Sequence, residues 1–91
     1  MITESCGNIF LDLGFPPEEA ALLAMRADLM TRLSDLIDAK GLTQVEAAKI
    51  LGVSQSRVSD LVCGKWERFS LDTLVTLALR AGMQVEMNLA A

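Results

Sequence analysis

The chain has 91 residues, of which 52% are hydrophobic, and it carries a formal net charge of −4 at pH 7. This length corresponds to one domain, and the apolar content is sufficient for a core. Because the sequence lacks His and contains only two Cys, with no evident base beside a nucleophile, we expect no enzyme, no metal site and no cofactor. Cys6 and Cys63 are expected to be separate thiols, with a disulfide between them as the alternative.

The first 15 residues show no clear helical periodicity, and we expect them to form a partly ordered N-terminal arm. Its apolar side chains can dock on the chain's own core, which is the simpler expectation, or on a partner; they are Ile9, Phe10, Leu13 and Phe15. The arm lacks the basic start and apolar centre of a signal peptide, and no apolar run approaches the length of a transmembrane helix. We therefore expect a cytoplasmic protein without membrane association.

A long helix is predicted over residues 17 to 39. Pro17 suits the first helical turn, and the two acidic residues that follow it favour the positive end of the helix dipole. Apolar residues then recur every three or four positions as far as Ile37, and Gly41 ends the pattern. The N-terminal half of this helix exceeds what a minimal helix-turn-helix requires, so it either covers the chain's own fold or contacts another chain.

Two short helices joined by a tight turn are predicted next. Thr43 and Glu46 have the spacing of a capping box at the start of the first helix. Gly52 can end that helix in a left-handed conformation, and Ser54 is a suitable N-cap for a second helix over residues 55–63. Two helices in this arrangement, with polar side chains at the start of the second, are typical of a DNA-reading helix-turn-helix.

The remaining sequence predicts a loop, a helix and a strand. Residues 65–69 mix two aromatic side chains with charged ones, and Ser70 is a suitable N-cap for a helix that ends near Arg80. Residues 83–89 alternate strictly between apolar and polar, which is the period of a half-buried β-strand. Such a strand must pair with the N-terminal arm, with its copy in a second subunit or with a partner. We assign dimerisation to its apolar side chains, which are Val85, Met87 and Leu89.

The charges are distributed unevenly along the chain. Residues 1–39 contain seven acidic and two basic side chains, whereas residues 40–68 contain three acidic and five basic ones. The positive block therefore coincides with the helix-turn-helix, and the acidic block lies outside it. This asymmetry suggests two surfaces with different partners, although an acidic surface can also serve solubility alone.

The motif in the central region resembles the Xre-type helix-turn-helix family, the group of the lambda repressor and Cro. The resemblance covers residues 30 to 80 and implies an all-α, five-helix, lambda-repressor-like domain over residues 16–82. Residues 1–15 would be the arm, and residues 83–91 a C-terminal β-strand extension. The matching segments, in order, are Leu42-Thr43-Gln44, Ala47-Ala48, Leu51-Gly52-Val53-Ser54-Gln55, Val58-Ser59 and Gly64-Lys65.

Flanking features are similar to a narrower subgroup, the HigA-type antitoxins that accompany RelE-like toxins. They are Gly7-Asn8-Ile9-Phe10 with Asp12-Leu13-Gly14-Phe15, then Gly64-Lys65 with Arg68-Phe69-Ser70, and the terminal strand from Gln84 to Leu89.

The family resemblance also implies which residues would touch DNA. Asp60 departs from the family pattern. An acidic side chain beside the surface that contacts DNA repels phosphate unless a basic side chain pairs with it. Trp66 either stacks against the nucleic acid or packs within its loop. The resemblance implies that Gln55, Ser56 and Arg57 would contact bases in the major groove, which is compatible with the pairing of Gln with adenine and of Arg with guanine. Contacts with phosphate groups would come from Gln44, Lys49, Ser54, Ser59, Lys65 and Arg68.

These features predict a homodimeric, sequence-specific DNA-binding autorepressor that recognises a palindromic operator in double-stranded DNA. The second resemblance implies the antitoxin of a toxin–antitoxin pair, whose basic RelE-like toxin would suit the acidic N-terminal block. Two alternatives stay open: a stand-alone or prophage-derived Xre regulator without a toxin, and a protein-interaction module that has lost DNA binding. No small-molecule ligand is expected.

Overall fold

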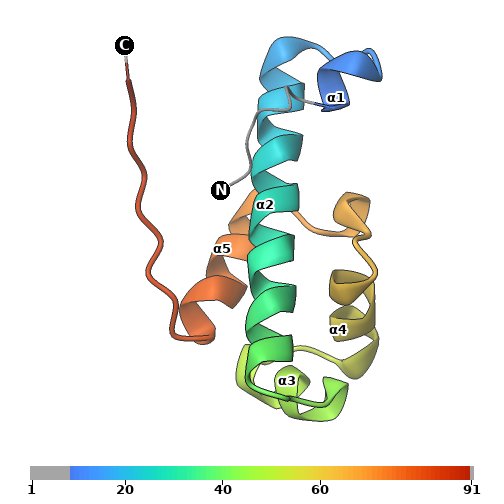
Figure 1. Cartoon of the computed structure of the whole chain (residues 1–91), viewed down its shortest axis with the longest axis vertical. Coiled ribbons are helices and arrows are strands. Elements are labelled where there is room, and N and C mark those ends of the chain that lie inside the picture. Colours follow the sequence, from blue (N-terminus) through green and yellow to red (C-terminus); the bar gives the residue numbers. More distant parts are fainter. Residues whose placement is uncertain (1–8, 91) are drawn as a thin grey trace.

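Helix α2 (Pro17–Ala39) is the longest element of the computed structural model, which describes residues 9–90 of the chain (Figure 1). It begins with proline at its first position and has two glutamates in its first turn, where carboxylates favour the positive end of the helix dipole. Gly41 follows the helix with a φ of 63°, a left-handed conformation that glycine adopts without steric cost. The predicted bounds, residues 17 to 39, are confirmed. In the described part of the chain, no helix is both long and apolar enough to cross a membrane.

Helices α3 (Gln44–Leu51) and α4 (Gln55–Val62) form the predicted helix-turn-helix. The capping box at the start of α3 is complete. The Glu46 amide donates to Thr43 Oγ1 over 3.1 Å, and the Thr43 amide donates to Glu46 Oε1 over 2.8 Å. Two backbone donors that a helix start leaves unpaired are thereby satisfied, which fixes where α3 begins.

The turn between α3 and α4 adopts the predicted backbone conformations. Gly52 is the C-cap of α3 and has a φ of 71°. The Ser54 hydroxyl accepts a hydrogen bond of 3.3 Å from the Arg57 amide and so caps the start of α4. Helix α4 ends at Val62, one residue earlier than predicted. Local caps on both sides of the turn therefore determine how the chain enters α4.

The chain after α4 forms a short 3₁₀ helix, η1 (Trp66–Arg68), and helix α5 (Leu71–Arg80). Ser70 caps α5, as predicted, by accepting a hydrogen bond of 3.2 Å from the Thr73 amide. Helix α5 lies beside α2, and the main core fills the space where α2, α3, α4 and α5 meet (Figure 1). The largest fully buried side chains of this core are Leu33, Leu61, Leu74, Leu77 and Val58.

Part of the N-terminal arm is a short helix, α1 (Ile9–Asp12), which the sequence periodicity did not predict. Phe10 is buried, 7% exposed, and packs with Ala20 and Leu23 of α2. Its ring also meets the ring of Trp66 edge-on, with the centroids 5.5 Å apart. One helical turn is too short to display a 3.6-residue period, so the pattern could not reveal it.

The arm docks on the chain's own core only in part. Phe10 is buried and Phe15 is half-buried, whereas Ile9 and Leu13 are exposed. The expected arm also includes residues 1–8, which lie outside the described residues. The three aromatic rings of Phe10, Phe15 and Trp66 contact one another edge-on. Trp66 therefore packs within the protein, which is one of the two alternatives considered for it.

Residues 83–90 do not form the predicted β-strand, and this part of the expected fold is wrong. Met83 packs against the main core, and the rest of the segment runs away from the end of α5 without regular secondary structure (Figure 1). Because residues 9–90 contain no strand, its backbone has no ladder partner there. Its apolar side chains are exposed, Val85 to 39%, Met87 to 82% and Leu89 to 89%. The alternation predicts which residues share a face, but a strand also requires a second strand beside it.

Candidate nucleic-acid interface

Helix α4 has one side locked into the core and the other open to solvent. Val58 and Leu61 are 0% and 1% exposed, and they fix the inner side. At 100° per residue, Ser56 and Ser59 lie on the side away from these two anchors. Gln55 and Ser56 are exposed in the first turn, and Ser59 is half-buried. The start of α4 thus exposes polar side chains on a helix that is anchored in the core.

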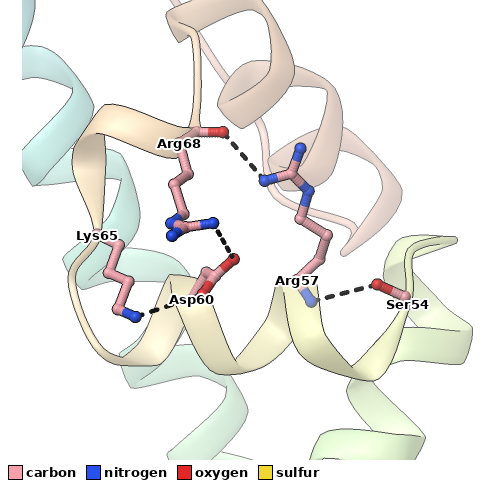
Figure 2. A network of polar contacts seen from close by, with 5 residues as sticks. All are labelled: Ser54, Arg57, Asp60, Lys65 and Arg68. Atoms are coloured by element: carbon pink, nitrogen blue, oxygen red, sulfur yellow. Dashed lines mark hydrogen bonds and ion pairs between the residues drawn. The ribbon is translucent and has the colours of Figure 1, made fainter.

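Arg57, the third residue predicted to contact bases, points toward the loop that follows α4 (Figure 2). Its Nη1 donates a hydrogen bond of 3.2 Å to the backbone carbonyl oxygen of Arg68. Its Cζ lies 5.3 Å from the centroid of the Phe69 ring, where the ring quadrupole attracts a cation. Arg57 therefore fastens α4 to the end of η1, and a base contact would require its side chain to leave this position.

Asp60 lies between two cations that were predicted to contact phosphate (Figure 2). Its Oδ1 is 3.9 Å from Lys65 Nζ, and its Oδ2 is 3.9 Å from Arg68 Nη1. The Asp60 side chain is only 19% exposed, whereas those of Lys65 and Arg68 are 51% and 58% exposed. The Lys65 amide also donates to the Asp60 carbonyl oxygen over 3.0 Å. Lys65 and Arg68 of the loop are thus the basic partners that offset the negative charge of Asp60.

Three other residues predicted to contact phosphate lie in α3 and at the N-cap of α4. Lys49 is exposed in the last turn of α3, and Gln44 is half-buried at its first position. Ser54 is exposed, with its hydroxyl engaged at the cap of α4. The structure connects three of the predicted DNA contacts (Figure 2). Arg57 donates to the Arg68 carbonyl oxygen, and Lys65 and Arg68 share Asp60.

Arg80 supports this site, although the sequence did not identify it. Its Nη1 donates a hydrogen bond of 2.9 Å to the carbonyl oxygen of Leu51, at the end of α3. The same Nη1 lies 3.0 Å from the place where a Cβ on Gly52 would stand. The contact joins residues 29 positions apart, so no local spacing could reveal it. A basic residue in the last turn of α5 was the one available signal.

Comparison with known proteins agrees with this geometry. A family described as "Helix-turn-helix domain" matches residues 9–90 of the chain. A solved structure named "Putative XRE Family Transcriptional Regulator" superposes with a TM-score of 0.76 at 33% sequence identity, covering 80% of this chain and 82% of that chain. A search of curated proteins gives no match. The chain belongs to the Xre-type helix-turn-helix family.

Proposed function

We propose that the protein is a DNA-binding transcriptional regulator whose helix α4 enters the major groove. The observation that carries this proposal is the exposure of Gln55 and Ser56 in the first turn of a helix whose opposite side is buried. In helix-turn-helix proteins, the N-terminal residues of the second helix contact base edges. Membership of the Xre-type family supports the same assignment.

Each residue at the start of α4 has a distinct proposed role. The Gln55 amide can donate to and accept from adenine, and the Ser56 hydroxyl can pair with several base edges. Arg57 is proposed to pair with guanine, for which it must exchange the Arg68 carbonyl oxygen and the Phe69 ring for the base. A bidentate Arg–guanine contact is strong enough to compensate for one backbone hydrogen bond.

Phosphate contacts are proposed for the cations and polar groups around α4. Lys65 and Arg68 are more than half exposed despite their contacts with Asp60, so phosphate can approach them. Since few positive charges are available per subunit, one subunit should bind DNA weakly and lose affinity as salt rises. The further proposed phosphate contacts are Gln44, Lys49, Ser54 and Ser59.

A homodimer would place two copies of α4 about 34 Å apart, one helical turn of DNA, on a palindromic operator. We assign the dimer contact to the terminal segment, residues 83–90, in which Val85, Met87 and Leu89 are exposed in the single chain. A second copy of this segment would cover Val85, Met87 and Leu89. The protein would then act as an autorepressor if the operator overlaps its own promoter.

A finer proposal is that the protein neutralises a basic toxin. Residues 9–25, which span α1 and the first part of α2, expose five large apolar side chains, and three acidic residues occupy the same stretch. A surface of this composition suits a basic protein partner. The apolar residues are Ile9, Leu11, Leu13, Leu22 and Met25, and the acidic ones are Asp12, Glu18 and Glu19.

The toxin proposal is tested by purifying the chain together with a basic protein encoded beside it. A complex that weakens when Glu18 and Glu19 are changed to lysine would support the antitoxin role. Separate elution of the two proteins, with DNA binding intact, would favour a stand-alone regulator.

DNA binding is tested by a mobility-shift titration against the DNA upstream of the gene, with random DNA as competitor and at two salt concentrations. Selective binding that weakens as salt rises would support the regulator. A folded protein without any sequence preference, even at low salt, would contradict it and favour an interaction module.

A further inference from the structure

The three cations of α4 and the following loop all contact groups within the protein (Figure 2). Arg57 is held by the Arg68 carbonyl oxygen and the Phe69 ring, and Lys65 and Arg68 flank the Asp60 carboxylate. An acid on the reading helix is at odds with a surface proposed to bind a polyanion. It lies between two cations that are proposed to contact phosphate, so its part in DNA binding needs an explanation.

We infer that Asp60 is a specificity-determining residue, which disfavours DNA of arbitrary sequence more than the operator. The inference rests on the proposed function and assigns Asp60 a part in it. The carboxylate has two physical effects on DNA binding. One is its charge, and the other is the geometry that it imposes on the loop cations.

The charge of Asp60 weakens the electrostatic part of DNA binding. Binding to arbitrary DNA comes almost entirely from attraction between cations and phosphate groups. A carboxylate 3.9 Å from both Lys65 and Arg68 offsets part of their positive charge and repels an approaching phosphate. Operator binding has the base contacts of Gln55 and Ser56 in addition, and these contacts do not depend on the charge. The charge therefore lowers both affinities, and the preference between the two DNAs comes from the geometry of the network.

The geometry of the network favours the operator. Lys65 and Arg68 are long, exposed side chains, whereas Asp60 is 19% exposed and stands on a helix anchored in the core. The carboxylate therefore attracts both cations and favours one arrangement of them over others. Preorganised cations fit the phosphate groups when α4 is in register with the operator, whereas released cations can adapt to any backbone. Since exposed ion pairs of this length are weak, they do not prevent a phosphate contact.

The test compares Asp60→Asn with Glu18→Gln, a change of equal charge at the far end of α2 from the helix-turn-helix (Figure 1). The wild-type protein first selects duplexes from a random pool. Dissociation constants are then measured for the best selected duplex and for random-sequence duplex, at two salt concentrations. Asp60→Asn should tighten binding to random duplex by about three- to tenfold and steepen its salt dependence by up to about one unit per subunit, whereas operator binding changes less.

A charge-balanced variant separates the two effects. Asp60→Asn combined with Lys65→Gln restores the net charge, so its binding to random duplex should return toward the wild-type value. Its preference for the selected duplex should stay below that of the wild type, because Arg68 no longer has the Asp60 carboxylate as a partner. Circular dichroism checks that each variant is folded, and Asp60→Ser replaces the amide variant if that one is unstable.

The outcomes distinguish this inference from the proposed function. If the wild type enriches a duplex but Asp60→Asn keeps the same preference ratio as Glu18→Gln, the inference is overturned and the regulator proposal survives. If Asp60→Asn weakens binding to both duplexes alike, Asp60 is only a structural support and the inference is again overturned. If the wild type enriches nothing, the proposed function fails, and the inference fails with it.

Discussion

Arg80 Nη1 donates a hydrogen bond of 2.9 Å to the carbonyl oxygen of Leu51, which joins the end of α5 to the end of α3. The last carbonyls of a helix have no partner within it, so Arg80 acts as a cap supplied by another helix. Its positive charge also favours the negative end of the α3 dipole. The contact therefore holds the turn from which α4 departs.

Arg80→Met should remove this cap while keeping most of the apolar stem. A hydrogen bond that involves a charged group contributes about 1.5–3 kcal/mol, so the free energy of unfolding should fall by about that amount. Urea denaturation measures the change. Arg32→Met is the control, because Arg32 forms an exposed pair with Asp28 on one helix and should change stability by about 0.5 kcal/mol or less. Equal losses in the two variants would contradict the capping role.

Gly52→Ala should destabilise the protein more than Gly41→Ala does. Both glycines have positive φ, 71° and 63°, and a left-handed alanine costs about 1–2 kcal/mol at either position. A Cβ on Gly52 would also lie 3.0 Å from Arg80 Nη1, whereas nothing lies within 4 Å of one on Gly41. The excess loss at Gly52 should shrink when Arg80 is Met. A thermodynamic cycle with no coupling between the two positions would show that Arg80 moves aside freely.

Features that depend on residues close together in the sequence could be predicted, whereas contacts between distant residues could not. Thr43, Ser54 and Ser70 cap their helices within three residues, so spacing alone predicted all three caps. The contacts of Arg57 with Phe69 and of Arg80 with Leu51 depend on how helices pack, and no local rule contains them. Site residues could be proposed from the motif, but the directions of their side chains could not.

The terminal segment was mispredicted for a different reason. Alternation over residues 83–89 describes side chains, whereas a strand is defined by hydrogen bonds to a second strand. The described chain offers none, and the pattern cannot say whether another molecule does. The short helix α1 is the opposite case, because it is present but was not predicted. Phe10 is held by its contacts with Ala20 and Trp66, which periodicity does not reveal.

Gln55→Ala and Arg57→Ala should separate base reading from loop support. Gln55 is exposed on the first turn of α4, so its change should reduce operator preference about fivefold or more and leave stability within about 0.5 kcal/mol. Arg57 also holds the Arg68 carbonyl oxygen and the Phe69 ring, so Arg57→Ala should lower the free energy of unfolding by about 1 kcal/mol as well. Competition binding and urea denaturation on the same samples provide both quantities.

A double variant should then abolish selective binding while the protein stays folded. Retained operator preference in Gln55→Ala with Arg57→Ala would exclude the start of α4 as the reading surface. If Arg57→Ala lowers stability but leaves base preference unchanged, Arg57 is a loop anchor in the complex as well as in the free protein. Arg57→Lys helps to tell these roles apart, because lysine keeps the charge but lacks the planar fork that matches guanine.

Val85→Asp combined with Met87→Asp should dissociate a dimer that forms through the terminal segment. Both side chains are exposed in the single chain, so the changes should leave the thermal unfolding of the monomer almost unaffected. In a dimer they would place charges in an apolar contact, where burial without a partner is costly. Sedimentation velocity across a range of concentrations measures the oligomeric state. Gln84→Asp with Asn88→Asp is the matched control, since it adds the same charge to the alternate face of the segment. If the apolar-face variant stays dimeric, the contact lies elsewhere, and the exposed apolar residues of α1 and α2 become the next surface to change.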